Sequence, residues 1–263
     1  MLTSTNTPGG PTWLDVGSPD IETHAAYYTR LFGWTFTPGD ATNNGYGRFK
    51  LGGRTIAGIG PLTEGASSGW TVYFGTRDAD GTAKAVLEAG GSVRVEPLDV
   101  DDKGRMAAFT DPTGAEFAVW QPGEVTGLED VNSPGSMSWL ELYTTDAASA
   151  KDFYRAVFGW DIVDAPMGGE GLAYSIVSPS GGGPTTMHGG LMQLPPDNLA
   201  AGSTSEWHPY FEVADCDEAA MQARELGGML LIPPMDVPMA GRIAMVLDPF
   251  GAVFALITSA PQQ

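Results

Sequence analysis

The same series of hydrophobic and polar patterns occurs twice along the chain. Apolar side chains at helical spacing lie between a Ser-Pro-Asp start at residues 18–20 and a glycine stop at Gly33, and they predict a helix. Short stretches in which apolar and polar residues alternate, as in strands, lie on either side of it. A second predicted helix, 78–89, ends at Gly90-Gly91. The first half therefore reads as strand, helix and three strands, and then the same again.

The strands predicted in this half are 13–16, 34–37, 47–51, 54–59, 71–76, 92–95, 105–110 and 115–120. In the second half, Asp146 begins a helix with the same apolar spacing, and 217–226 is the later helix. The chain thus consists of four βαβββ modules, two in each half, and we predict an α+β fold.

The two halves also share short motifs in the same order. Trp-Leu-Asp at 13–15 recurs as Trp-Leu-Glu at 139–141, Phe-Gly-Trp at 32–34 recurs at 158–160, and Asp-Pro-x-Gly at 111–114 recurs at 248–251. A repeat of this length is typical of a folded domain. We predict domains at 1–121 and 137–263 joined by a linker, 122–136, which is rich in Gly, Pro and acidic residues. The second copy has extra residues in the Gly/Pro/Ser-rich text of 178–205, where we expect a loop.

Composition narrows the classes of partner. The chain has 263 residues, 13 Lys and Arg against 32 Asp and Glu, and a net charge of −19. Such an acidic protein repels nucleic acid and anionic membranes. Cys216 is the only cysteine, so a disulfide within the chain and a cysteine-based zinc site are excluded. No signal peptide or membrane span is visible, and we expect a cytoplasmic monomer or homodimer.

These motifs, on four consecutive βαβββ modules, resemble the vicinal oxygen chelate superfamily of glyoxalases, bleomycin resistance proteins and extradiol dioxygenases. The likeness extends over residues 12–120 and 137–258, and it is nearest to two-domain glyoxalase-like proteins of actinobacteria. It implies two tandem glyoxalase-like domains, each a mixed sheet folded into a cupped, incomplete barrel. It also implies a divalent metal (Zn, Ni, Mn or Fe) in the cup, held by His, Glu or Gln side chains.

The metal positions that the resemblance implies carry few ligands in this chain. The first-strand positions are Trp13 and Trp139, and the last-strand positions are Ala118 and Ala255. On the fifth strand of each domain, one copy has Thr71 and the other has His208. Only His208 is a ligand type, so we expect no firmly bound metal. If one binds, the candidate ligands are His208, Glu141 and His188.

Candidate site residues follow from strand alternation. His208, Tyr210 and Glu212 share one face of a strand, and a histidine suits proton transfer or metal binding. Asp15 and Glu141 occupy equivalent positions two residues after Trp13 and Trp139. A carboxylate on an inner face needs a partner, and we expect an Arg, a His or a ligand beside each. The predicted catalytic residues are His208 and Glu141. The predicted ligand-binding residues are Trp139, Tyr143, Tyr210, Glu212, Trp13 and Asp15.

Three further residues, His188, Arg105 and Arg242, are not assigned to the interior of the cup. His188 has no histidine counterpart, since Ile56 aligns with it, and we expect it to be exposed or at the rim of the cup. Arg105 and Arg242 follow a glycine in both copies, which favours a structural ion pair over the binding of an anionic substrate.

The preferred function is that of a small-molecule pocket protein, acting on or binding an organic metabolite between aromatic walls. As an enzyme it would carry out a lyase, isomerase or hydroxylase-like step, with His208 moving a proton next to a carbonyl of the metabolite. One alternative is non-catalytic sequestration of a drug or metabolite. The other is a divalent-metal lyase or dioxygenase with an atypical ligand set.

Overall fold

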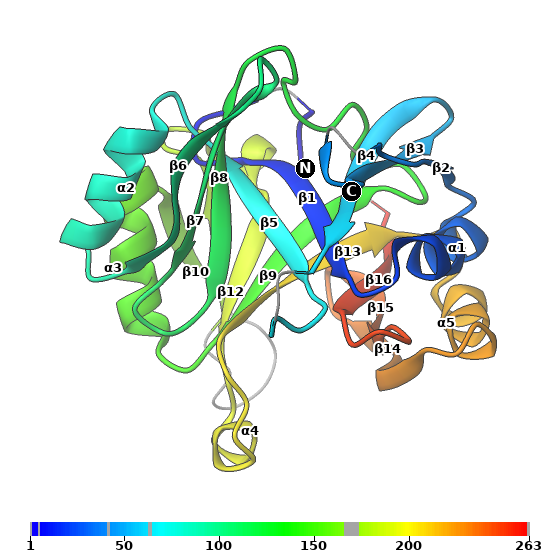
Figure 1. The fold of residues 1–263 in the computed structure, drawn as a ribbon. Helices are drawn as coiled ribbons and strands as arrows, with labels where there is room; N and C mark the ends of the chain where they lie inside the picture. The colour runs from blue at the N-terminus through cyan, green and yellow to red at the C-terminus, as the bar shows by residue number, and fades with distance from the viewer. Residues whose placement is uncertain (1, 5, 41–42, 63–64, 166–173, 262–263) are drawn as a thin grey trace. The chain divides into compact units, whose positions relative to one another are not determined.

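Each half of the chain contributes one eight-stranded mixed sheet (Figure 1). The computed structural model describes residues 2–4, 6–40, 43–62, 65–165 and 174–261. In this part of the chain the first sheet has the strand order β2-β3-β4-β1-β5-β8-β7-β6, and the second has the order β10-β11-β12-β9-β13-β16-β15-β14. In the first sheet β1 pairs in parallel with β4 and β5 with β8, and the outer strands pair antiparallel. The predicted α+β class with two tandem glyoxalase-like sheets, neither closed into a barrel, is confirmed.

The strands of the first sheet are β1 (Pro11–Ser18), β2 (Thr35–Thr37), β3 (Gly47–Leu51), β4 (Arg54–Pro61), β5 (Trp70–Gly75), β6 (Ser92–Val100), β7 (Gly104–Thr110) and β8 (Glu116–Pro122). Those of the second are β9 (Met137–Thr144), β10 (Asp161–Ala165), β11 (Tyr174–Ser178), β12 (Gly189–Gln193), β13 (Glu206–Glu212), β14 (Met229–Val237), β15 (Gly241–Leu247) and β16 (Val253–Ser259). The main helices are α1 (Ile21–Phe32), α2 (Ala79–Glu88), α3 (Ala147–Phe158) and α5 (Cys216–Glu225).

The helices begin and end where their capping residues predict. Asp20 and Asp146 accept hydrogen bonds from backbone N–H groups of the first turns of α1 and α3. Gly33 and Gly159 end these helices with φ of 70° and 67°, in the left-handed region that glycine adopts without strain. Helix α5 is capped by Asp215 and begins at Cys216, one residue before the predicted range.

Strand β6 runs five residues beyond its predicted end at Val95. Its pairing with β7 shifts register between Val93 and Val95 and again between Val95 and Leu98. Such irregularities interrupt the alternation by which a strand is recognised in sequence.

The Gly/Pro/Ser-rich stretch predicted as a loop also contains a short exposed helix, α4 (Pro196–Ala200), which Figure 1 shows at the end of an excursion of the chain.

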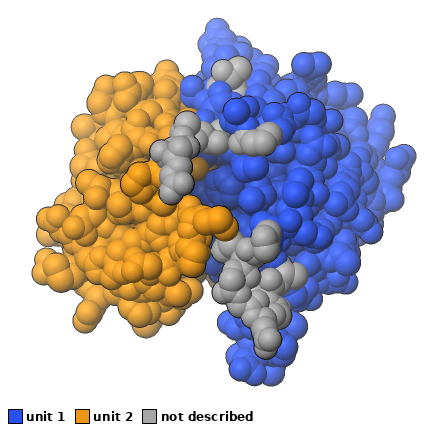
Figure 2. Space-filling view, turned by 180° about the vertical axis from the view of Figure 1, so that it is seen from behind, with its two compact units in different colours: residues 1–13, 72–127, 139–207 blue, residues 14–71, 128–138, 208–263 orange. Residues whose placement is uncertain are grey.

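The chain divides into two compact units that do not coincide with its two halves (Figure 2). Unit 1 comprises residues 1–13, 72–127 and 139–207, and unit 2 comprises residues 14–71, 128–138 and 208–263. Helices α2 and α3 are in contact within unit 1, and α1 and α5 are in contact within unit 2. Each unit therefore combines one module from each repeat.

A Trp–Tyr–Asp hydrogen-bond chain lies in the core of each unit. In unit 1, Trp207 Nε1 donates to the Tyr154 hydroxyl at 2.8 Å, and that hydroxyl donates to Asp111 Oδ2 at 3.1 Å. In unit 2, the same chain runs from Trp70 through Tyr28 to Asp248, at 3.0 and 2.7 Å. Each buried polar atom in the two chains thereby gains a partner.

These hydrogen-bond chains explain why the Asp-Pro-x-Gly motif recurs. Oδ1 of the aspartate accepts a hydrogen bond from the backbone N–H of its own turn, at Ala115 in one copy and Ala252 in the other. Oδ2 accepts a hydrogen bond from a tyrosine hydroxyl of the opposite repeat. The motif thus both forms a turn and links modules of the two repeats.

Candidate functional site

Strand β9 separates core residues from candidate site residues by alternation. Leu140 and Leu142 are fully buried, while Trp139, Glu141 and Tyr143 lie on the opposite face and are half-buried. We call that face, directed away from the helix core, the open face of the sheet. The structure thus places all three predicted residues of β9 on one face, within unit 1.

A tyrosine completes a polar group around Glu141. The Tyr174 hydroxyl accepts a 3.2 Å hydrogen bond from Trp139 Nε1. Burial and the charge of Glu141, to which Tyr174 is also hydrogen-bonded, raise the pKa of the Tyr174 hydroxyl. It therefore stays protonated and can donate its proton to the carboxylate. Gly190 is opposite Glu141 on β12, and a Cβ there would lie 1.9 Å from the Tyr174 hydroxyl oxygen.

The same group occurs in unit 2 with residues of the first repeat. Tyr46 donates a 2.8 Å hydrogen bond to Asp15 Oδ2. Gly58 is opposite Asp15 on β4, and a Cβ there would lie 2.0 Å from the Tyr46 hydroxyl oxygen. The expectation of an Arg, a His or a ligand beside each carboxylate therefore missed the partner that the structure shows, which is a tyrosine hydroxyl.

Strand β13 places His208 and Tyr210 on the face opposite the aromatic core. Phe211, between the strand's polar positions, packs against Trp70 and Phe254 in the core of unit 2. His208 is 6% exposed, and burial lowers the pKa of its imidazole to about 4. The ring is therefore neutral at pH 7, the form that accepts a proton or binds a metal.

Glu212 has structural partners on the neighbouring strand. Its two carboxylate oxygens accept hydrogen bonds from the backbone N–H and the hydroxyl of Ser259, at 3.0 and 2.6 Å. These contacts hold the end of β16 against β13, so the predicted ligand-binding role of Glu212 has no support from its geometry.

An apolar wall surrounds Tyr210 in unit 2. The strand register aligns Tyr210 with Ala255, and Ala255 with Met245. Met245 is in turn opposite Ile232 on the edge strand β14. Side chains that are opposite each other in a sheet project from one face. The position where the family resemblance implies a metal-binding glutamate is therefore a small apolar residue in an apolar row.

Unit 1 contains the equivalent row of the first repeat. Tyr73 aligns with Ala118, Ala118 with Ala108, and Ala108 with Val95. Ala118 again replaces the implied glutamate. Trp13, which was predicted to bind a ligand, also lies in unit 1. Its side chain is 7% exposed.

His188 was expected to be exposed or at a rim, and this prediction is wrong. The side chain is 2% exposed and lies in the core of unit 1, with its ring 5.0 Å from Trp160. Neither ring nitrogen has a hydrogen-bond partner among the described residues. Burial lowers the pKa of this imidazole to about 3. His188 occupies the core position of its counterpart, Ile56, which is 1% exposed, so it is not directed toward the open face.

Sequence reasoning missed three residues with notable chemistry: Tyr46, Tyr174 and His24. The two tyrosines had a detectable signal, because a glycine inside a strand often marks close approach of another group. Gly58 and Gly190 are such glycines. His24 Nε2 lies 2.6 Å from Asp248 Oδ2, and both side chains are fully buried. No motif connects these two residues, which are 224 positions apart.

The two repeated arginines form ion pairs, as predicted. Arg105 contacts Asp80 and Asp99, and Arg242 contacts Asp217 and Asp236. Cys216 is buried, and burial together with Asp217 raises the pKa of its thiol to about 11, so it is not a nucleophile at neutral pH.

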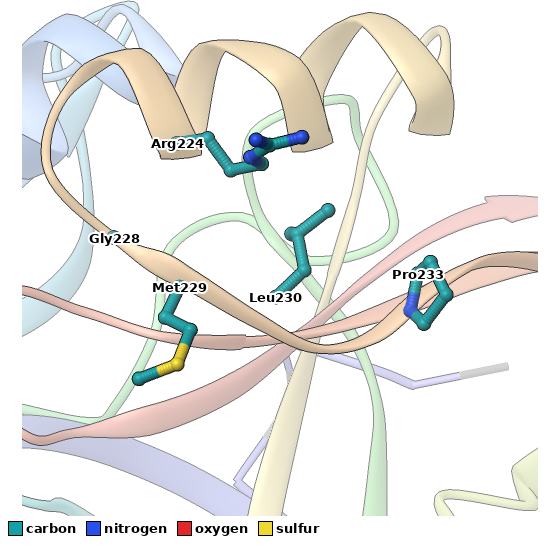
Figure 3. Close-up of a pocket in the computed structure, with 5 residues that line it drawn as sticks. All are labelled: Arg224, Gly228, Met229, Leu230 and Pro233. Atoms are coloured by element: carbon teal, nitrogen blue, oxygen red, sulfur yellow. The ribbon is translucent and has the colours of Figure 1, made fainter.

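A surface pocket of about 410 Å³ lies between α5 and β14 in unit 2 (Figure 3). Arg224 contributes from the helix, and the other lining residues, Gly228, Met229, Leu230 and Pro233, come from the following turn and strand. None of the predicted site residues lines it.

The residues present do not fit a firmly held metal. Within the described ranges, no three His, Cys, Asp or Glu side chains form a group that could hold a metal ion. Trp13, Trp139, Ala118 and Ala255, at the positions that the resemblance implies, have no metal-binding atom in their side chains.

In the same described ranges, no helix has the length and apolar character to cross a membrane.

Comparison with known proteins agrees with this architecture. The model of the Glyoxalase/Bleomycin resistance protein/Dioxygenase superfamily matches residues 136–256, and that of a Glyoxalase-like domain matches residues 12–120. The chain is 40% identical to the anthracycline biosynthesis protein DauV of Streptomyces sp. (strain C5), over 95% of this chain and 93% of that protein. It is 34% identical to the putative glyoxylase CFP32 of Mycobacterium tuberculosis, over 97% of both. The chain therefore belongs to the glyoxalase/bleomycin resistance/dioxygenase, or vicinal oxygen chelate, superfamily.

Solved structures show the same fold at low identity. Homoprotocatechuate 2,3-dioxygenase from Brevibacterium fuscum, in complex with 3,4-dihydroxyphenylacetate, has a TM-score of 0.65 and 14% identity, over 98% of this chain and 82% of that chain. The Mn(II)-bound glyoxalase from Novosphingobium aromaticivorans has a TM-score of 0.61 and 16% identity, over 95% and 82%.

Proposed function

We propose that this protein binds a planar, hydroxylated aromatic metabolite on the open face of its second-repeat sheet. The observation that carries the proposal is the group formed by Trp139, Glu141 and Tyr174. A carboxylate that accepts a hydrogen bond and an indole ring that can stack on a flat molecule lie together on one half-buried face. Aromatic walls with few polar groups are typical of small-molecule sites.

The relatives support an aromatic metabolite. DauV and DnrV, which is 39% identical to this chain and comes from Streptomyces peucetius, are both named anthracycline biosynthesis proteins. We infer a related role here, in the modification or handling of an aromatic product. The row of Tyr210, Ala255 and Met245 in unit 2 is apolar and buried, and it has no metal ligand at the position of Ala255.

His208 is the residue that we propose for chemistry. Its imidazole, on the strand face opposite the core of unit 2, can take a proton from a carbon or hydroxyl next to a carbonyl of a ligand that reaches this face, and return it. Glu141 lies in unit 1 and His208 in unit 2, so their cooperation as a catalytic pair stays a prediction.

Binding is tested by calorimetric titration with alizarin, a dihydroxylated anthraquinone, against the wild type and two matched variants. Glu141→Gln removes the charged acceptor and should weaken binding at this site about tenfold or more, since hydrogen bonds to charged groups contribute about 1.5–3 kcal/mol. Glu88→Gln, on the exposed surface of α2, should leave the affinity unchanged. A wild type that binds neither alizarin nor other hydroxylated polycyclic aromatics would refute the proposal.

A substitution at His208 distinguishes a catalytic function from sequestration of the ligand. The substrate for this test is a hydroxyaryl ketone in deuterated water. If His208 acts as a base on the bound ketone, the protein should speed deuterium uptake at the carbon next to the ketone carbonyl. His208→Ala should abolish that acceleration, which is typically 10²- to 10⁴-fold for a positioned base. A protein that only sequesters its ligand shows no acceleration in the wild type, and the same variant keeps its affinity.

A further inference from the structure

The carboxylate–tyrosine–glycine group occurs in both repeats, with a different acid in each. Asp15, Tyr46 and Gly58 form it in unit 2, and Glu141, Tyr174 and Gly190 form it in unit 1. In both cases the glycine is opposite the acid on the neighbouring strand, and the tyrosine hydroxyl occupies the space that a Cβ would fill. Two repeats with different acids have thus kept the same arrangement of three groups.

The fold alone does not account for this arrangement. The core face of β1 is filled by Leu14 and Val16, both fully buried, and the acid lies on the other face. Glycine inside a strand weakens it, and glycine is kept where another group must approach the backbone closely. Gly58 leaves room for the end of the Tyr46 ring, whose hydroxyl donates to Asp15.

The chemistry of the pair selects one kind of ligand group. A carboxylate is an acceptor only, and it has several lone-pair sites. The tyrosine proton is already donated to it, so the pair has no hydroxyl proton left to donate to a ligand. A ligand therefore has to donate a hydrogen bond to this pair, as a phenol or alcohol hydroxyl does. A ketone, ether or carboxylate oxygen finds no donor in it.

We propose that the Asp15–Tyr46 pair is a second ligand site, so that each chain binds two molecules through hydroxyl groups, one in each repeat. This inference rests on the proposed function and extends it to the first repeat. The two sites differ in reach, because the aspartate side chain is one methylene shorter than the glutamate. The two sites also lie in different units, because Asp15 and Tyr46 belong to unit 2 and Glu141 and Tyr174 to unit 1.

The test is the stoichiometry of alizarin binding by calorimetry in the wild type, Asp15→Asn, Glu141→Gln and the double variant. We expect two molecules per chain in the wild type, about one in each single variant, and a ten- to hundred-fold loss of affinity in the double variant. Tyr46→Phe, which removes one oxygen atom only, should weaken the first site without changing the second. Circular dichroism and the melting temperature establish that each variant is folded.

The dimethyl ether of alizarin tests the donor requirement. It has the same ring system and no hydroxyl proton, and we expect it to bind the wild type at least tenfold more weakly. Asparagine supplies an N–H donor, so Asp15→Asn should narrow the difference between the two compounds at the first site. A merely structural role of Asp15 would not alter this selectivity.

Each outcome has a distinct meaning. One molecule per chain, lost in Glu141→Gln and unaffected by Asp15→Asn and Tyr46→Phe, overturns the second site and leaves the proposed function standing. Equal affinity for alizarin and its dimethyl ether overturns the donor requirement. No binding of any hydroxylated aromatic compound overturns the proposed function itself.

Discussion

His24 donates a hydrogen bond of 2.6 Å to Asp248 in the core of unit 2, and both side chains are fully buried. The equivalent of His24 in the other repeat is Ala150, and Asp111 there is contacted by Tyr154 without a histidine. The fold therefore accommodates an alanine at this position in one unit and a charged hydrogen bond in the other.

We expect His24→Ala to lower the free energy of unfolding by about 3 kcal/mol, because it removes a partner of a buried carboxylate and leaves space beside Phe250. Urea unfolding measures this change. Arg155→Ala is the control, since it breaks an exposed contact with Asp152 and a long exposed hydrogen bond to the Ile162 carbonyl, and it should change stability by less than about 0.5 kcal/mol. A His24→Ala protein as stable as the control would show that the pair contributes nothing.

Acid stability should depend on Asp248. Burial acts to raise the pKa of this carboxyl, but the hydrogen bonds and charge of His24, with Tyr28, prevail and hold it below 3.8. A lowered carboxyl pKa contributes stability above the unfolded value, which is lost as the pH falls through the folded value. Asp248→Asn should therefore show a shallower fall of stability between about pH 4 and pH 2 than the wild type. Identical slopes in denaturant titrations over this range would contradict the assignment.

His188→Ile should stabilise the protein by about 1–2 kcal/mol at pH 7, because it replaces two buried ring nitrogens, for which the described residues supply no hydrogen-bond partner, with the residue found at the equivalent position. The reciprocal variant, Ile56→His, should destabilise it by a similar or larger amount. Melting temperatures of the two variants measure both effects. Stabilisation by Ile56→His would contradict this account of the site.

The advantage of His188→Ile should grow as the pH falls. The folded pKa of His188 is about 3, below the ordinary 6.5. The unfolded chain therefore takes up a proton below pH 6.5 that the folded chain does not. At pH 5.5 this difference adds about 1.4 kcal/mol to the effect of the substitution. An effect of the same size at pH 7.5 and pH 5.5 would show that the imidazole is not buried in its neutral form.

Gly190→Ala should destabilise the protein by about 1–3 kcal/mol, because the new Cβ would lie 1.9 Å from the Tyr174 hydroxyl oxygen. The same substitution in a Tyr174→Ala background should cost much less. A double-mutant cycle of unfolding free energies measures the coupling. Additive effects would mean that the tyrosine does not lie over the glycine.

Metal analysis of the purified protein should find well below one equivalent of Zn, Ni, Mn or Fe per chain, and a chelator should not alter the affinity for alizarin. The reason is the donor set, in which Ala118 and Ala255 stand at two positions where the superfamily resemblance implies a ligand. Stoichiometric metal that tracks with binding would contradict this expectation.

The fold could be predicted from sequence because local and periodic signals determine it. Alternation assigned His208 and Phe211 to opposite faces of β13, and the structure agrees. The end of β6 could not be found in this way, since register shifts near Val95 break the alternation. His188 was misplaced because a histidine was given more weight than the apolar residue, Ile56, at the same position of the other repeat.

For the candidate site, the sequence predicted the two acids and not the tyrosines that are hydrogen-bonded to them. Asp15 and Glu141 followed from the repeat, because one strand determines which face a side chain occupies. Tyr46 and Tyr174 are brought to them by the pairing of more distant strands, and a one-residue change of register would place them elsewhere. The pairing of His24 with Asp248 connects opposite repeats, and no local pattern in the sequence encodes it.

The most direct test of the central claim is a crystal structure of the protein with alizarin. We expect electron density for the ring system beside Trp139, with a hydroxyl oxygen within hydrogen-bond distance of a Glu141 carboxylate oxygen. Density for alizarin that avoids the open faces of both sheets, in crystals where the compound is bound at full occupancy, would contradict the claim.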